Sequence, residues 1–396
     1  MANVSSSNGL EKRPALSFRD DCGREFPSWH RTTLGTIIEP YSEKVHGEHD
    51  FEVLTSSREG LQRQIDHFGS QQRHDTDGYN IIPLGFCTYR NRSDDGRFTF
   101  NINKISDKAI VSKFYPVFRF KNANSTFMTE YLNSSARARK KLSVLAVGTS
   151  QVVLSFEALK SAKFDLPCKE EQDKIASLLE CLNERVELQR SFVDALKKYK
   201  RGLLSNLFGE KITQGCTTKS YYFSEIAQRR SEKYDPTSGI EYPCVELENI
   251  EQETGKILST VPSTAQSSIK NIAKSGDTLF GKLRPYLRKY AFAQKTMACS
   301  SEIWALIPSD AVLPKFLFYL VQTEQFLRVA NISSGTKMPR AEWSNIEKTE
   351  FFIPDPFVQR KVVSLLEGLD QKITFADSAL FSLNRLRASL MQQLFI

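Results

Sequence analysis

The sequence predicts an α+β fold in which two similar globular segments alternate with two long helices. Three observations support this prediction: an internal repeat, a helical pattern of apolar residues in both copies of that repeat, and short strand-like runs upstream of each copy. The chain has 396 residues, of which 40% are hydrophobic, and this is enough for two or three domains with cores of their own. We therefore expect globular domains at residues 1–165 and 211–352, and long helices at residues 166–210 and 353–396.

The repeat aligns Leu166–Phe208 with Ile353–Phe395 without a gap, at an offset of 187 residues (353 minus 166). Helical periodicity alone would repeat the leucines, but it would not repeat a proline, a glutamine and a lysine in the same register. The same offset places Phe156 on Trp343, so the duplication extends into the globular segments. The identical pairs include Pro167/Pro354, Gln172/Gln359, Lys174/Lys361 and Ser177–Glu180/Ser364–Glu367.

Each copy of the repeat has the pattern of a long amphipathic helix. Apolar residues recur at alternating steps of three and four, as in the seam of a coiled coil. About 40 residues at ~1.5 Å each give a rod of roughly 60 Å, and we expect the two rods to pack together because a lone helix cannot bury its apolar stripe. The predicted interface residues are Ile175, Leu178, Leu182, Leu196 and Leu203 in the first helix, and Val362, Leu365, Leu369, Leu383 and Leu390 in the second.

The globular segments contain short runs rich in β-branched and aromatic residues, separated by Gly, Asn, Asp and Pro. Examples of such strand-like runs are residues 79–90, 109–120, 276–283 and 302–308. Residues 315–330 add a helical run. We therefore expect each segment to be an α+β domain.

The charge balance is compatible with a polyanionic partner. Lys and Arg number 54 and Asp and Glu number 46, which gives a net charge of +8 and a pI near 9.0. The N-terminus has no apolar signal-peptide core, and the apolar run Phe316–Val321 is far too short to span a bilayer. The seven cysteines are scattered without a CxxC pair, as in a reduced compartment. These features predict a cytoplasmic protein.

Catalytic and metal motifs are incomplete wherever they are suggested. Residues 276–283 approach a phosphate-binding loop, but Leu283 stands where Ser or Thr is needed for Mg²⁺. Asp355–Phe357 is only superficially like a methyltransferase motif, and His46 and His49 have no further ligands at suitable spacing. We therefore expect a non-catalytic binding chain without a cofactor or metal of its own.

Basic and aromatic residues alternate in four loops of the globular segments, which is a pattern suited to nucleic acid. Arg and Lys neutralise phosphates, and Arg and Asn also hydrogen-bond base edges in the major groove. The candidate DNA-binding residues are Tyr89, Arg90, Asn91, Arg92, Arg97, Ser150 and Gln151 in the first segment, and Arg229, Arg230, Lys233, Lys282, Arg284, Tyr286, Arg288, Lys289, Thr336, Lys337 and Arg340 in the second.

Specific motifs add a family resemblance that covers essentially Pro14 to Ile396. The resemblance rests on the starts and ends of the two helices and on four loop motifs. The helix starts are LPCKEEQDKIASLL and IPDPFVQRKVVSLL, and the helix ends are KKYKRGLLSNLF and LRASLMQQLF. The loop motifs are FPSWHRTTLGTI, GDTLFGKLRPYLRK, CSSEIWAL and SGTKMPRAEW. The chain resembles the specificity (S) subunit of bacterial and archaeal type I restriction–modification systems.

This resemblance implies two target recognition domains, each of which reads one half of a bipartite, asymmetric DNA site. It also implies that the two long helices form an antiparallel coiled coil, which sets the half-site spacing and carries two adenine methyltransferase (M) subunits. S-adenosylmethionine would be bound by the M subunits, and ATP and Mg²⁺ by restriction (R) subunits. The resemblance thus implies double-stranded DNA, M subunits and R subunits as partners, and no membrane.

Three alternatives remain open at this point. A duplicated DNA reader that serves another methyltransferase or effector would share every motif. A coiled-coil scaffold that does not bind DNA would show no salt-sensitive DNA binding. A nuclease with an unrecognised active site would cleave DNA in the presence of Mg²⁺.

Overall fold

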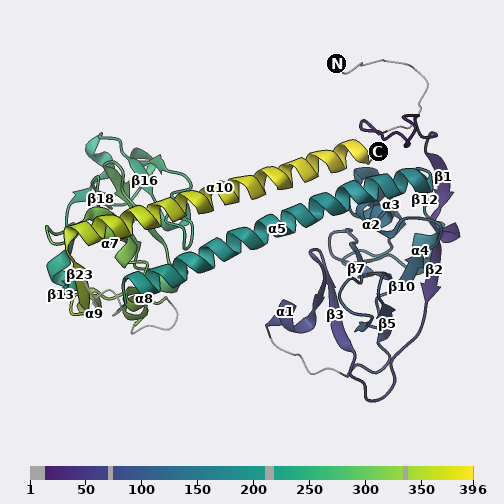
Figure 1. Ribbon diagram of the computed structural model, residues 1–396, viewed down its shortest axis with the longest axis horizontal. Helices are drawn as coiled ribbons and strands as arrows, with labels where there is room; N and C mark the ends of the chain where they lie inside the picture. The colour runs from purple at the N-terminus through teal and green to yellow at the C-terminus, as the bar shows by residue number, and fades with distance from the viewer. Residues whose placement is uncertain (1–13, 70–74, 210–217, 333–337, 396) are drawn as a thin grey trace. The chain divides into compact units, whose positions relative to one another are not determined.

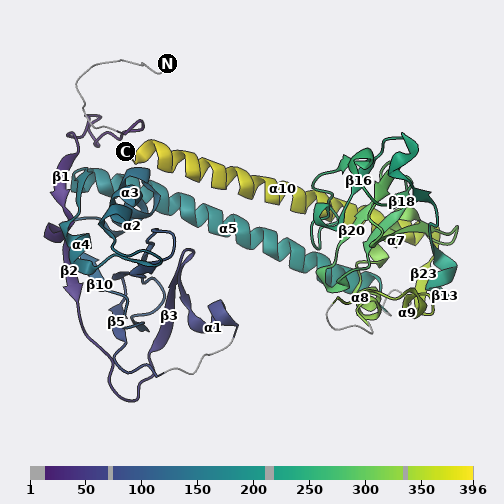
Figure 2. The same cartoon turned by 180° about the vertical axis from the view of Figure 1, so that it is seen from behind.

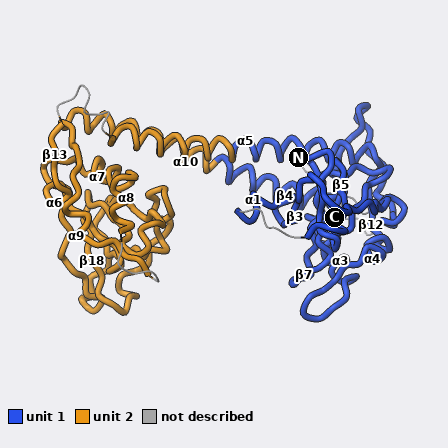
Figure 3. The backbone as a smooth tube through the Cα atoms, turned by 90° about the horizontal axis from the view of Figure 1, so that it is seen from below, with its two compact units in different colours: residues 1–189, 379–396 blue, residues 190–378 orange. Residues whose placement is uncertain are grey.

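The computed structural model describes residues 14–69, 75–209, 218–332 and 338–395. The chain divides into two compact units (Figure 3). Unit 1 comprises residues 1–189 and 379–396, and unit 2 comprises residues 190–378. Each of the two long helices therefore contributes a segment to both units.

Unit 1 is built from small sheets on which short helices pack. In both four-stranded sheets neighbouring strands are antiparallel, except β3 and β9, which are parallel. Its described strands, in sheet order, are β1 (His30–Thr33) with β12 (Lys163–Leu166); β2 (Ile38–Tyr41), β10 (Val117–Phe120), β6 (Cys87–Tyr89) and β8 (Phe100–Ile102); β4 (Gly60–Arg63), β3 (Glu52–Ser57), β9 (Lys108–Val111) and β5 (Asn80–Pro83); and β11 (Val152–Val153) with β7 (Arg92–Ser93).

Unit 2 repeats three of these sheets, one of them with an additional strand, β15, and an isolated bridge between Leu283 and Arg340 stands in place of the fourth. Its parallel pair is β16 with β21. Its described strands, in sheet order, are β13 (Thr218–Tyr222) with β23 (Glu350–Pro354); β14 (Ala227–Arg229), β22 (Ile303–Pro308), β19 (Thr278–Gly281) and β20 (Tyr290–Phe292); and β15 (Lys233–Tyr234), β18 (Lys270–Ala273), β21 (Met297–Cys299), β16 (Pro243–Val245) and β17 (Val261–Pro262).

The last three described short helices of each unit occupy the same place in the chain, after β10 in unit 1 and after β22 in unit 2 (Figure 1). The described short helices of unit 1 are α1 (Gln64–Phe68), α2 (Ser125–Ser134), α3 (Ala136–Leu145) and α4 (Phe156–Ser161). Those of unit 2 are α6 (Phe223–Ile226), α7 (Pro314–Leu320), α8 (Glu324–Ala330) and α9 (Trp343–Ile346). Single 3₁₀ turns occupy Leu34–Thr36, Pro236–Ser238, Leu247–Asn249, Ser263–Ala265 and Pro285–Leu287. The long helices are α5 (Lys169–Leu207) and α10 (Pro356–Leu394), of 39 residues each.

The shared strand order confirms the predicted duplication and the α+β fold class. β2, β10, β6 and β8 correspond to β14, β22, β19 and β20 in the same order, and in both units a two-stranded pair precedes a long helix. Gly85 and Gly276 lie just before β6 and β19, with φ of +79° and +94°. Only glycine adopts such a backbone readily, so a turn requirement accounts for this repeated residue.

The repeated glutamine fixes the start of each long helix to its own unit. Gln172 donates through Nε2 to the carbonyl of Pro167 (3.0 Å) and accepts from the N–H of Asn124, the N-cap residue of α2 (2.9 Å). Gln359 makes the equivalent bonds, donating to the carbonyl of the repeated proline (2.9 Å) and accepting from the N–H of Leu313, which precedes α7 (2.8 Å). A buried amide with these partners leaves few polar groups unsatisfied, and this explains why the repeat retains the polar residue.

The core of each unit includes residues of both long helices. In unit 1, the Phe395 ring beyond the end of α10 lies 5.8 Å from Phe127 and 5.6 Å from Tyr131, measured between ring centroids. Figure 2 shows α2 and α3 beside the first turns of α5. In unit 2, the core combines Leu204 of α5 with Leu366 of α10. The helix segments are therefore integral parts of each unit's core.

Candidate nucleic-acid interface

The segment that follows β6 in unit 1 forms an exposed arginine turn. Arg90, Arg92 and Arg97 are exposed. The backbone N–H of Arg97 donates to the Ser93 hydroxyl (3.0 Å), and Gly96 adopts a φ of +71°. β7 pairs with β11, which holds the start of this turn against the sheet. The sequence thus folds locally so that arginines project from a turn braced by serine and glycine.

Asp95 shapes the turn electrostatically. Hydrogen bonds from the Ser93 hydroxyl and the Arg97 N–H lower the pKa of its carboxyl, with a further contribution from Arg58, whose Nη2 lies 2.7 Å from Oδ2. Arg58 is an exposed cation that sequence reasoning missed, because it lies in the β3–β4 turn and reaches this site only through sheet pairing. A small cavity of about 110 Å³ lies among these arginines, with serine and threonine hydroxyls on its walls. Guanidinium groups so arranged can bind phosphate oxygens or the edge of guanine.

Other candidates of unit 1 have structural roles or lie near the turn. Tyr89 is completely buried, and its hydroxyl donates to the carbonyl of Leu154 (3.0 Å). Its predicted DNA contact is thus corrected to a core role, and burial raises the pKa of its phenol. Asn91 is half-buried, and its backbone carbonyl accepts from the N–H of Leu154 (2.9 Å). Ser150 and Gln151 are exposed, and the Gln151 amide donates to Asp94 (3.0 Å).

The corresponding segment of unit 2 follows β19. Arg284 is exposed at a φ of +52°, and its backbone N–H donates to the carbonyl of Pro339 (2.8 Å). Leu283 forms an isolated antiparallel β-bridge with Arg340, at the place where β7 pairs with β11 in unit 1. The side chain of Arg284 has no ion-pair partner among the described residues, and Tyr286 beside it is 54% exposed. These two side chains are therefore available to a ligand.

Glu302 organises two further cations of this surface. Its carboxylate contacts Nε and Nη2 of Arg340 at 3.1 Å each, and it lies 3.9 Å from Nζ of Lys282. The ion pair raises the pKa of the Arg340 guanidinium. Arg229 lies over the Trp343 ring at 4.7 Å and near Trp304 at 5.8 Å. Such contacts hold guanidinium planes in fixed orientations.

Four other predicted cations of unit 2 are engaged within the fold, and Arg230 and Arg288 are held by two-pronged ion pairs. Arg230 makes a two-pronged pair with the buried Asp277 (2.6 and 2.8 Å), which raises the pKa of the guanidinium. Arg288 pairs with Glu324 in the same way (2.6 and 3.2 Å). Lys233 donates to the Asn271 side chain (2.6 Å) and Lys289 to the Leu247 carbonyl (2.7 Å). Thr336 and Lys337 lie outside the described residues.

The predicted helix seam is one residue out of phase at several positions. Ile175, Leu182, Val362 and Leu369 are buried. Leu178, Leu196, Leu203, Leu383 and Leu390 are half-buried. Leu365 is 51% exposed, and the adjacent Leu366 is completely buried in its place. The long helices pack on their own unit's sheets and short helices as well as on each other, so the buried stripe shifts relative to a plain heptad seam.

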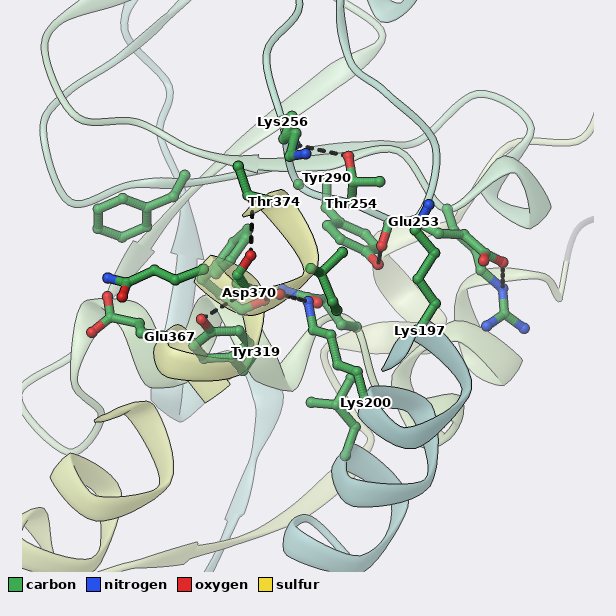
Figure 4. A pocket seen from close by; sticks show the side chains of 18 of the residues that line it. Lys197, Lys200, Glu253, Thr254, Lys256, Tyr290, Tyr319, Glu367, Asp370 and Thr374 are labelled. Carbon is green, nitrogen blue, oxygen red and sulfur yellow. Dashed lines mark hydrogen bonds and ion pairs between the residues drawn. The ribbon is translucent and has the colours of Figure 1, made fainter. Parts of the chain in front are cut away.

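A cavity of about 560 Å³ lies in unit 2 between α5, α7, β20 and α10 (Figure 4). At its base Nζ of Lys200, which is 6% exposed, lies 2.7 Å from Asp370, and the Tyr319 hydroxyl donates to the same carboxylate (2.9 Å). Each of the six described cations on its wall pairs with a carboxylate: Lys197–Asp377, Lys200–Asp370, Arg201–Glu253, Lys256–Asp377, Arg288–Glu324 and Lys315–Glu367. The cavity is thus lined by satisfied ion pairs, which suits a structural junction.

Unit 1 has a polar cluster at the equivalent place. Nη2 of Arg387 lies 3.0 Å from Glu130, and its Nε lies 2.5 Å from Oδ1 of Asn183. The offset of 187 residues carries Asn183 onto Asp370 and Lys200 onto Arg387. In each unit, therefore, a cation from the late part of one long helix meets a polar residue from the early part of the other.

Two features of the described residues bear on other functions. No group of three or more His, Cys, Asp or Glu side chains is placed to hold a metal ion among them. Within the same residues, none of the helices combines the length and apolar character that a membrane span requires.

Comparison with known proteins gives consistent findings. A family model described as the type I restriction modification DNA specificity domain matches residues 49–197 and 223–379. The HindI specificity subunit of a type I restriction enzyme from Haemophilus influenzae is 26% identical over 198 residues, which cover 45% of this chain and 40% of that protein. The matched segment thus spans less than half of this curated relative.

Solved structures share the fold over nearly the whole chain. The S subunit of a type I restriction–modification system from M. genitalium has a TM-score of 0.57 at 16% identity, and the match covers 97% of this chain and 99% of that one. A chain from work on complex assembly and conformational transition of the type I R-M system has a TM-score of 0.54 at 16% identity, covering 94% and 98%. At these identities the likeness concerns the fold.

Proposed function

This chain belongs to the family of type I restriction modification DNA specificity domains, and we propose that it is the non-catalytic subunit that selects the DNA sequence for such a system. The observation that carries the proposal is the duplicated strand plan with an exposed basic segment after β6 in one unit and after β19 in the other. Each unit would read one half of a bipartite, asymmetric site. Base edges would be read by arginines, and phosphates would be neutralised by the cations around them.

The long helices would set the gap between the two half-sites. A helix keeps a fixed rise of about 1.5 Å per residue, whereas a flexible linker of the same length would allow a broad range of gaps. Inserting one heptad into both α5 and α10 should therefore change the gap by about three base pairs and leave both half-site sequences unchanged. Altered half-site sequences in a selection from random duplexes would contradict this division of labour.

The chemistry would come from partner subunits. Two adenine methyltransferase subunits would dock on the long helices, which expose large apolar side chains to solvent. On α5 these include Leu188, Phe192 and Tyr199, with exposed fractions of 64%, 54% and 62%. Exposed apolar stripes of this kind are typical of protein interfaces. Methyl transfer from S-adenosylmethionine and ATP-dependent restriction would then belong to the methyltransferase and restriction subunits.

Replacing Phe192 and Tyr199 by Ser should weaken association with the methyltransferase subunit by about 2 kcal/mol or more, because truncation of aromatic anchors dominates interface energies. The stability of the isolated chain should change little, since both side chains are more than half exposed. Titration calorimetry measures the first quantity and thermal unfolding the second. The exposed Lys198→Ser is the matched control on the same helix, and unaltered affinity in the aromatic double variant would exclude this docking face.

The decisive experiment selects bound sequences from random duplexes, using the full chain together with an adenine methyltransferase subunit of the same system. Enrichment of two short motifs at a fixed gap is the expected result. Enrichment of a single motif would mean that only one of the two units recognises a DNA sequence. Normal complex assembly without any enrichment would contradict the proposal and leave the scaffold alternative.

A further inference from the structure

Helix α3 of unit 1 carries a basic face that sequence reasoning missed. Residues 131–156 contain four cations, Arg137, Arg139, Lys140 and Lys141, and no carboxylate. Ser135 caps the helix by accepting from the N–H of Ala138 (3.2 Å), and Ala138 and Leu142 are buried. The cations therefore lie on the faces of a well-anchored helix that the core does not occupy.

Three of these cations are available to a partner. Arg137 and Lys140 are exposed and Arg139 is half-buried, and none of the three forms an ion pair with a described residue. Lys141 is engaged, since its Nζ donates to the carbonyl of Lys163 (2.5 Å). An unpaired cluster of three cations repels itself, so a polyanion that neutralised it would bind favourably.

The basic face is continuous with the arginine turn that follows β6. Gly96 of the turn lies against Ser143 in the third turn of α3. The approach is so close that a Cβ added to Gly96 would lie only 2.7 Å from Oγ of Ser143. The loop beyond α3 is attached to the same turn, because the Gln151 amide donates to Asp94. Val144 and Val147 lie at this junction with exposed fractions of 76% and 77%. Apolar atoms of this kind can contact sugars and thymine methyl groups.

The described residues of unit 2 include no equivalent basic helix face. The corresponding helix is α8, which is also capped by a hydroxyl, that of Thr323. It is three residues shorter and carries Arg328 with Glu324, and Glu324 pairs with Arg288. The duplication therefore retained the helix but gave it a basic face in one copy only.

We propose that the basic face of α3, formed by Arg137, Arg139 and Lys140, is a phosphate-backbone anchor by which unit 1 supplies a larger share of sequence-independent DNA affinity than unit 2. This inference rests on the proposed function and adds an asymmetry to it. The anchor grips the duplex beside the half-site read by unit 1. It carries no sequence information, because phosphates are the same at every step.

The test compares the triple variant Arg137→Gln, Arg139→Gln and Lys140→Gln with the wild type, both assembled with the methyltransferase subunit. Glutamine keeps helix propensity close to that of Arg and Lys. We expect the slope of log K against log salt to become shallower by about 2 to 3, on the selected duplex and on a random duplex alike. At physiological salt the affinity should fall by about tenfold or more. The selected sequence should stay the same.

The matched control exchanges the cations without loss of charge, as Arg137→Lys, Arg139→Lys and Lys140→Arg, and should keep the wild-type slope. A triple Gln variant whose salt slope equals that of the wild type would overturn the anchor, while a wild type that still enriches a bipartite site would leave the proposed function intact. A wild type that enriches no sequence would contradict the proposed function instead. The anchor would then still be judged by the slope on random duplex.

Discussion

The variant Asp370→Ala should lower the free energy of unfolding of unit 2 by about 3 kcal/mol. The carboxylate lies 2.7 Å from Nζ of Lys200 and also accepts from the hydroxyl of Tyr319. Lys200 is only 6% exposed, so the substitution leaves a buried ammonium without a counter-ion, and removing one partner of a buried pair typically costs about 3–5 kcal/mol. We take the lower end of that range because the Asp370 side chain is about one third exposed.

Urea unfolding monitored on the full chain measures this loss. Asp370→Asn is the matched control, because it keeps an acceptor for Tyr319 and places the residue of the equivalent position, Asn183, into unit 2. It should cost less, about 1–2 kcal/mol, since hydrogen bonds to the amide offset part of the lost charge. A change below about 0.5 kcal/mol for Asp370→Ala would show that the junction does not depend on this pair.

The duplication and the fold class could be predicted from the sequence because the repeat keeps residues whose roles are local to each copy. The proline and glutamine at each helix start are an example. Gln172 and Gln359 each bond to a carbonyl five residues earlier and to the N-cap of a short helix. A bond pattern that is repeated in two places leaves the same residue types at the same offset, which a sequence alignment detects.

The phase of the buried helix stripe could not be predicted in the same way. Adjacent leucines, such as Leu365 and Leu366, satisfy a three-and-four pattern equally well. The structure buries Leu366 completely and leaves Leu365 51% exposed. The choice depends on the short helices and sheets that pack on this part of α10 in unit 2, and helical periodicity contains no information about them.

The candidate site, like the fold, could be predicted from the sequence only in part. Sequence reasoning found the exposed segments after β6 and β19, because basic and aromatic residues gather there. It could not separate Arg284 from Arg230 and Arg288, because the carboxylates that engage the last two are 47 and 36 residues away in sequence. It also missed Arg58 and the basic face of α3. For α3 a signal was present, since a run of four cations without a carboxylate is unusual for a solvated helix face.

The variants Arg284→Ala and Arg92→Ala should each relax one half-site and leave the other unchanged. Both side chains are exposed, and neither has an ion-pair partner among the described residues. They follow β19 and β6, which occupy the same place in the two units. A guanidinium that donates two bonds to guanine discriminates against other bases by about 1–3 kcal/mol, which is about 5- to 150-fold. Selection from random duplexes, repeated with each variant in the assembled complex, measures this loss of preference position by position.

Arg284→Lys separates base reading from phosphate contact, because it keeps the charge and removes the planar two-pronged donor. If Arg284 reads a base, Lys should relax the second half-site nearly as much as Ala does, while the salt dependence stays that of the wild type. If Arg284 contacts only phosphate, Lys should restore wild-type behaviour, and Ala should weaken binding to all sequences equally. Relaxation of both half-sites by a single variant would contradict independent reading by the two units. The duplicated fold would then act as one reader, with each arginine contributing to a shared set of contacts.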